Sequence, residues 1–404
     1  MATATEQSTR RIAYLAGGRL FLKEGEAEPN EILCTFAEQL KDRMAKHHQK
    51  NDWKNSGGNP MTGALVWGGN PFDEGHVGTA IAAIAPSDKD GQLLYGLNTD
   101  DVAGIFLRPI LQNADEKRLV HTNESNIHTL SSPDTEGRIA CSISGRGGLQ
   151  NLSVYRIGSP GFTEITEGDS LDACASWIPG REGHLVYQSA GIGRDGTGLW
   201  IDTGPASVEH LDTTKGEIHT LLADRQHDYL SPQVDANGKL YCIRRPYKGD
   251  EKIGFGKFAT GWLGAPFRLL GAIGSWLNLF SVRYTGKPLN SAGGPKRDTP
   301  DLRQMMLLGN LIDADQVRKD AARRGEKNPD IVPKTWQLIE TSASRPSSAN
   351  AKVLAKGVIA FHVSQSGEIL YSNGSAIFNQ PADGGRAKLV EEAHNVQQIL
   401  ALDQ

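Results

Sequence analysis

The sequence predicts an all-β fold, a six-bladed β-propeller closed by pairing between its N-terminal and C-terminal strands. Three observations lead to this prediction: a strand opening that recurs six times, a turn ending in glycine before five of its copies, and an unpaired apolar run near the C-terminus. All-β propellers often form a single domain of this length, so we expect residues 1–404 to fold as one unit.

The repeated feature is a four-residue apolar strand opening. Its six copies begin at Arg11, Gln92, Arg138, His184, Lys239 and Glu368. Turns ending in glycine precede five of them, at Gly91, Gly137, Gly183, Gly238 and Gly367. Successive openings are 81, 46, 46, 55 and 129 residues apart. The period is therefore 46 residues, and the longer spacings contain insertions.

Each repeat contains four short strands separated by Gly, Pro, Asp and Asn. A four-stranded sheet cannot bury both faces alone, so the units must stack around an axis. The opening at Arg11 has no inner strand before it, whereas the apolar run 396–402 has no partner. We expect this run to supply the missing inner strand, because that pairing protects both sheet edges.

Three of the repeats share a further motif before the opening. It is Ser132-Pro-Asp134 before Gly137-Arg-Ile-Ala140, with degenerate copies at Trp177-Ile-Pro179 and Ser231-Pro232. This pattern resembles the TolB-type (WD40-like) propeller repeat, in which such turns link the two inner strands of a blade. The resemblance covers about half of the chain, in blades three to five, since the other blades lack Ser-Pro-Asp. It implies the propeller fold and the binding of proteins or peptides, but no particular chemistry.

The first insertion, residues 36–74, lies in the first blade. It begins with a helical pattern in which Phe36, Leu40 and Met44 are four residues apart and share one face. Two interpretations stay open: a helix that covers one end of the ring, and a helix that binds a partner.

The second insertion, residues 250–333, lies within the fifth blade and is basic. Residues 252–297 include seven Lys or Arg and no Asp or Glu; residues 251–333 carry a net charge of +5, and the rest of the chain −9. Within it, the 21 residues 262–282 contain one charge, Arg268, and predict a helix that is apolar nearly all round and must be buried. A single membrane crossing would leave the later blades on the wrong side, so we expect no span.

The sequence leaves three interpretations of what buries this helix: an anionic membrane surface, a partner protein or second copy, or the flank of the ring itself. The docking residues would be Trp262, Leu263, Phe267, Arg268, Leu270, Ile273, Trp276, Leu277, Phe280 and Arg283. Two short helices, 301–308 and 313–324, are expected to brace the segment.

Motifs of known catalytic chemistry are missing from the sequence. It contains no nucleophile elbow, HExxH, Walker loop or GxGxxG after a strand, so we predict no enzyme, catalytic residue, cofactor or metal site. Polar residues expected at the mouth of the central channel are His76, His128, Asp172, His227, Asp228 and His394. They would contact a ligand such as a peptide terminus, bind a metal, or solvate a water-filled funnel.

The charge and the cysteine content limit which binding partners and which cellular compartment we expect. A net charge of −4 gives no general attraction to nucleic acid. The four cysteines, Cys34, Cys141, Cys174 and Cys242, lie far apart, which predicts buried free thiols in a reducing compartment. The N-terminus has no apolar core of the signal-peptide type. We therefore expect a cytoplasmic protein, with or without peripheral membrane association.

These features predict a non-catalytic interaction platform. Its fifth-blade insertion would dock it to a partner protein or a membrane surface, as part of a larger assembly. The alternative is a channel-centred, metal-dependent hydrolase or lyase that uses the His and Asp residues. A third hypothesis, a propeller that gates a separate peptidase chain, comes from the family resemblance alone.

Overall fold

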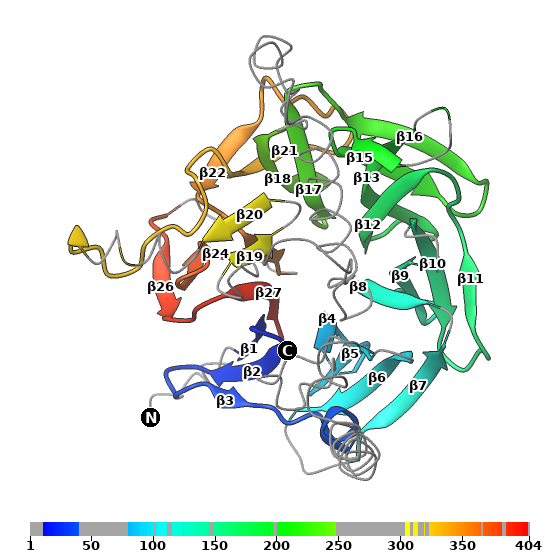
Figure 1. Ribbon diagram of the computed structural model, residues 1–404, viewed down its shortest axis with the longest axis horizontal. Helices are drawn as coiled ribbons and strands as arrows, with labels where there is room; N and C mark the ends of the chain where they lie inside the picture. The colour runs from blue at the N-terminus through cyan, green and yellow to red at the C-terminus, as the bar shows by residue number, and fades with distance from the viewer. Residues whose placement is uncertain are drawn as a thin grey trace, which may run out of the picture.

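Short antiparallel strands arranged around a ring make up most of the described chain. The structure, a computed structural model, describes residues 11–39, 80–89, 91–99, 102–110, 115–123, 125–144, 149–194, 196, 200–247, 304–307, 310–313, 319, 323–364, 367–381 and 385–402. Figure 1 shows the sheets following one another around an axis in chain order, from blue to red. We call each four-stranded unit a blade and name it by its first strand in the sheet order.

Four of the sheets are single blades, in which the strands follow one another outward from the first. The β27 blade contains β27 (Val396–Ala401), β1 (Arg11–Ala16), β2 (Arg19–Glu24) and β3 (Asn30–Glu31). The β4 blade contains β4 (Ala80–Pro86), β5 (Gln92–Asn98), β6 (Ala103–Pro109) and β7 (Lys117–Thr122). The β17 blade contains β17 (His227–Val234), β18 (Lys239–Pro246), β21 (Gln337–Ser342) and β22 (Lys352–Lys356). The β23 blade contains β23 (Ala360–Val363), β24 (Ile369–Ser372), β25 (Ile377–Gln380) and β26 (Lys388–Glu391).

The remaining large sheet joins two such units. The β8 blade contains β8 (Asn126–Pro133), β9 (Arg138–Ser144), β10 (Gln150–Arg156) and β11 (Phe162–Glu164). The β12 blade contains β12 (Ser170–Trp177), β13 (His184–Arg194), β15 (Ser207–Asp212) and β16 (Glu217–Leu222), with β14 (Trp200–Thr203) paired to the end of β13. One parallel pair, Gln150 with Leu171, connects the two blades.

The recurring strand openings each begin the second strand of a blade, as the repeat predicts. Strands β1, β5, β9, β13 and β18 begin at the predicted residue, and β24 begins one residue later. The glycines before five of these strands have φ between 71° and 81°, a region that a β-carbon disfavours. At Gly183 a β-carbon would lie 2.8 Å from the Thr214 side chain. Local backbone geometry therefore explains the repeated glycine.

The predicted pairing between the chain ends is present. Strand β27 pairs antiparallel with β1, with Ile12 opposite Ala401 and Tyr14 opposite Ile399. In Figure 1 the red strand β27 lies beside the dark blue strand β1. Tyr14, Ile399 and Val396 belong to one buried cluster with residues of the β17 and β23 blades. The C-terminal strand thus completes the first blade and packs it against its neighbours.

Side-chain amides from the first or second strand of one blade bond the first strand of a neighbouring blade. The Gln398 amide accepts a hydrogen bond from the backbone N–H of Ile84 (2.8 Å) and donates to its carbonyl (2.7 Å). Asn98 makes the same pair of bonds with Ile127, at 3.0 and 2.7 Å. Gln233 donates to the Phe361 carbonyl. These bonds satisfy buried backbone groups that strand pairing within one blade leaves free.

The first insertion is anchored where it begins. Residues 35–39 are helical, and the buried Glu116 carboxylate accepts the backbone N–H groups of Thr35 and Phe36, each at 3.0 Å. The Tyr95 hydroxyl donates to the same carboxylate. Residues 40–79, which contain the rest of the predicted insertion, lie outside the described residues.

The second insertion contains a hairpin where a helix was predicted. Strands β19 (Gln304–Leu307) and β20 (Asn310–Asp313) pair antiparallel, so the expected helix over 301–308 is wrong. Leu307 pairs with Asn310, so only two residues connect the strands, and glycine at position 309 suits such a short connection; this preference outweighs the helix start at Pro300. Asp313 is the last residue of β20, so the second predicted helix, 313–324, cannot begin there, although residues 319 and 323 are helical. Among the described residues no helix has the length and apolar character needed to cross a membrane.

Both insertions emerge from the same face of the ring. The first ends at Ala80, where β4 begins. The second follows Pro246, which ends β18 and pairs with His227 at the start of β17. Both therefore leave at the end where the first strands of the blades start, which we call the insertion face. The glycine turns lie at the opposite end, the glycine-turn face.

We expect the Gln398→Ala substitution to destabilise the ring by about 1–3 kcal/mol, because it leaves the buried N–H and C=O of Ile84 without partners. Urea denaturation measures the change. The matched control is Gln397→Ala on the exposed side of the same strand, which should leave the unfolding free energy nearly unchanged. Equal effects of the two substitutions would contradict the bridging role of Gln398.

Candidate functional site

A dense polar network lies at the start of β17, on the insertion face. We call it the β17 mouth, and it consists of Asp224, His227, Asp228, Tyr229, Arg244, Arg245, Gln337 and Ser348. Two of these residues, His227 and Asp228, were predicted as channel residues. The second insertion leaves the ring directly beside them, after Tyr247, whose backbone N–H donates to the Gln226 carbonyl.

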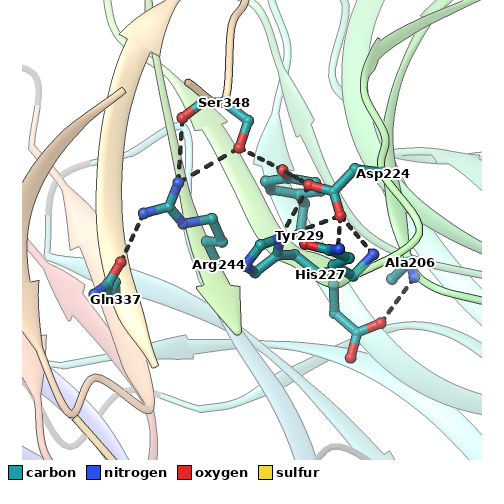
Figure 2. Close-up of polar contacts among 9 residues, drawn as sticks. Ala206, Asp224, His227, Tyr229, Arg244, Gln337 and Ser348 are labelled. Carbon is teal, nitrogen blue, oxygen red and sulfur yellow. Dashed lines mark hydrogen bonds and ion pairs between the residues drawn. The ribbon is translucent and has the colours of Figure 1, made fainter. Parts of the chain in front are cut away.

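Asp224 organises the connection that leads into β17. One carboxylate oxygen accepts the backbone N–H groups of Gln226 and His227, both at 2.7 Å. The other accepts the Tyr229 hydroxyl (2.5 Å) and lies 3.0 Å from Nδ1 of His227 (Figure 2). Burial alone would raise the pKa of Asp224, but these hydrogen bonds outweigh it and lower the pKa below its usual value. An Asp side chain commonly bonds the backbone two residues on in a turn, which explains this local geometry.

Tyr229 extends the network to the outer strands. Its hydroxyl lies 2.7 Å from the Ser348 hydroxyl, and Arg244 donates to the carbonyl of Ser348 at 3.2 Å. Arg244 also donates to the Gln337 side chain at 2.7 Å, as Figure 2 shows. Burial, with the bond to Asp224, raises the pKa of Tyr229 to about 12, so the phenol stays protonated at neutral pH. Ser348 is held by Tyr229 and Arg244 rather than by His227, so these residues form no Ser-His-Asp triad.

Asp228 and Arg245 form a buried ion pair beside this network. Arg245 Nε donates to the Asp228 carboxylate at 2.8 Å, and the other oxygen of Asp228 accepts the backbone N–H of Ala206 at 2.9 Å. The guanidinium lies 4.8 Å from the centre of the Trp336 ring. Its Nη1 atom is buried and has no hydrogen-bond partner among the residues the structure describes. The site therefore holds a fixed cation with an unused donor.

The other predicted channel residues are held in separate contacts. His128 Nε2 lies 2.7 Å from the Ser144 hydroxyl, and the buried Asp172 accepts the Ser189 hydroxyl at 2.7 Å. His394 is exposed in the connection before β27, and His76 lies outside the described residues. In the described ranges no group of three or more His, Cys, Asp or Glu side chains is placed to hold a metal ion.

Sequence reasoning missed most of the β17 mouth. Asp224, Tyr229 and Ser348 carried no motif, but Arg244-Arg245 at the end of an apolar strand was a visible signal, because two charges there need partners. The predicted docking residues between Trp262 and Arg283 all lie outside the described residues.

The fold and its closure define the chain as a β-propeller, and comparisons with known proteins agree. No protein-family model and no curated protein matches the sequence. Solved structures do match: TolB from Acinetobacter baumannii, with 10% identity over 99% of this chain and 68% of that chain, has a TM-score of 0.52. A chain of a nidogen/laminin complex, with 8% identity over 96% of this chain and 97% of that one, has a TM-score of 0.51. At these identities the likeness shows a TolB-like propeller fold and nothing further.

We expect Asp228→Ala to destabilise the protein by about 3–5 kcal/mol, because it leaves the Arg245 charge buried without its partner. Adding Arg245→Met should recover much of this loss, since the double variant buries no unpaired charge. Chemical denaturation of the two single variants and the double variant measures the coupling. If Asp228→Ala does not fold, Asp228→Asn replaces it. Purely additive effects would show that the two residues are not coupled.

The lowered pKa of Asp224 predicts a pH-dependent effect of Tyr229→Phe. A carboxyl whose pKa falls on folding adds stability above its ordinary pKa of about 4, and this stability is lost as the pH falls through the folded value. Removing the Tyr229 hydroxyl should raise the pKa of Asp224 toward normal. The stability difference between wild type and variant should therefore shrink in acid. Urea midpoints measured from about pH 2 to about pH 7 test this; a difference independent of pH would contradict it.

Proposed function

We propose that this protein is a non-catalytic interaction platform, a six-bladed ring that binds its partner at the insertion face through residues 250–333. The observation that carries the proposal is topological: both long insertions join the ring on one face, and the second of them joins it beside the β17 mouth. A face that carries two insertions and a dense polar network is suited to recognition, because binding residues commonly lie on loops that a rigid scaffold positions.

The rigidity of the ring supports this role. The β1–β27 pairing and the amide bridges of Asn98, Gln233 and Gln398 fix the blades relative to one another. Near the second insertion, Tyr247 donates its hydroxyl to the Thr203 carbonyl at 2.5 Å, and Asn373 donates to the Asp330 carboxylate at 3.0 Å. Both roots of the insertion are thus bonded to the ring, and force on the insertion is transmitted to a stiff frame.

The composition of the insertion suits two kinds of partner. Its net charge of +5 and the apolar run 262–282 match either a protein with an apolar groove and acidic rim or an anionic membrane surface. The nidogen/laminin complex contains a similar fold in a protein assembly, which supports a protein partner by analogy. The ring itself, without the insertion, is net negative and gives no reason to bind nucleic acid.

The free thiols of this protein support its location in a reducing compartment such as the cytoplasm. All four cysteines are free, and Cys34, Cys141 and Cys242 are buried. Burial raises the pKa of Cys141 and of Cys242, the latter to about 12, which keeps these thiols protonated and unreactive. The metal-dependent hydrolase or lyase is not proposed, because His128, Asp172 and Asp228 each bond a different partner.

Replacing residues 252–303 by a short Gly/Ser linker should abolish association without unfolding the ring. This deletion removes every predicted docking residue and keeps Asn328 and Asp330, whose oxygen atoms accept the Asn373 amide. Pull-down from the native host and sedimentation with vesicles of anionic or neutral lipid separate the two partners. Circular dichroism and thermal unfolding serve as the folding control. If the truncated protein associates as strongly as the full chain, the docking role of the insertion is wrong.

A further inference from the structure

A pocket of about 340 Å³ lies between the β17 and β23 blades, toward the glycine-turn face. This volume falls within the range of small-molecule sites in proteins. The pocket lies at the opposite end of the blades from the points where both insertions join the ring, so it is separate from the proposed docking face. Its walls come from β18, β21 and β22 on one side and from β24, β25 and the connection before β26 on the other.

The difference in side-chain size between the two walls explains why the space is open. On the β17 blade, Tyr241, Glu340 and Lys352 form a row across three strands, since each is the register partner of the next. The wall from the β23 blade includes the small residues Gly367, Gly385 and Ala387 beside the longer Gln380 and Arg386. At the small residues few atoms extend into the gap, which leaves part of the space between the blades unfilled.

The two carboxylates of the pocket are already satisfied. Asp235 accepts the backbone N–H groups of Asn237 (2.9 Å) and Lys239 (2.8 Å), and it also accepts the Tyr241 hydroxyl (3.2 Å). Glu340 pairs with Lys239 Nζ at 3.2 Å. Neither carboxylate is left to attract a cationic ligand.

Two cations at the pocket have no such partner. Lys352 and Arg386 are exposed and form no ion pair with any residue that the structure describes. Both residues line the pocket, to which Leu354, Ile369 and Pro381 contribute apolar side chains. An Arg guanidinium binds a carboxylate or a phosphate through two parallel hydrogen bonds, and Lys adds a point charge.

We propose that this inter-blade pocket binds a small organic anion, whose carboxylate or phosphate group lies between Lys352 and Arg386 and whose apolar part contacts Leu354 and Ile369. The pocket gives the propeller a second recognition site, on the face opposite to the one where the insertions join the ring. The charges of Lys352 and Arg386 disfavour a cation, and the apolar side chains of Leu354 and Ile369 offer contacts that a bare inorganic ion cannot make.

Protection of Lys352 from acetylation tests the proposal on the full chain. The probes are hexanoate and hexyl phosphate, with hexylammonium as the oppositely charged control. At about ten times the Kd of a bound probe, acetylation of Lys352 should fall roughly tenfold, because only the free fraction reacts. Lys356 lies on the same strand outside the pocket and should be acetylated at an unchanged rate, as measured by peptide mass spectrometry.

The possible outcomes distinguish a carboxylate from a phosphate head group, and they also test the proposal itself. Protection of Lys352 alone by either anion supports the site, and the anion that protects at lower concentration identifies the preferred head group. Arg386→Ala should weaken protection about tenfold, whereas Lys388→Ala, on the neighbouring strand outside the pocket, should not. The proposal is overturned if neither anion protects Lys352, if Lys356 is protected equally, or if hexylammonium protects as well as the anions.

Discussion

Pairing between β27 and β1 holds the ring closed, and the contacts around the axis depend on that closure. Without it, the first blade would lack its innermost strand and the ring would end in two open sheet edges. Gln398 adds a second connection, because it lies on the same strand and bonds Ile84 of the next blade. One short C-terminal strand thus completes one sheet and attaches it to another.

A closed ring turns short, individually unstable sheets into a scaffold on which recognition sites can be placed. Each blade has two ends, and the chain uses them differently. The insertions join the ring where the first strands begin, which is also where the β17 mouth lies. The tight glycine turns lie at the other end, next to the pocket between the β17 and β23 blades. In our two proposals, the first of these faces binds a large partner and the second binds a small ligand. The buried Asp228–Arg245 pair and the Asp224 network stiffen the strand that lies beside the second insertion.

The features that the sequence predicted are those with a local or repeated cause. A positive φ before a strand requires glycine whatever surrounds it, so Gly137 and Gly238 mark their turns directly. The bridge between Gln398 and Ile84 joins residues 314 positions apart and depends on which blades are neighbours, so no local pattern announces it. Only a small part of the β17 mouth was predicted, for the same reason: His227 and Asp228 lie at a strand start, whereas Ser348 reaches Tyr229 only through folding. The helix expected over 301–308 failed because a hairpin turn and a helix start compete within a few residues.

Lysine footprinting of the intact protein, free and associated with its partner, tests the central claim most directly. Lys327 lies at the root of the second insertion, where it pairs with Glu392 at 2.7 Å before β27, and Lys89 lies in the turn between β4 and β5 on the glycine-turn face. If the insertion face docks the partner, labelling of Lys327 falls on association and labelling of Lys89 does not change. Protection of Lys89 with unchanged labelling of Lys327 would contradict the account.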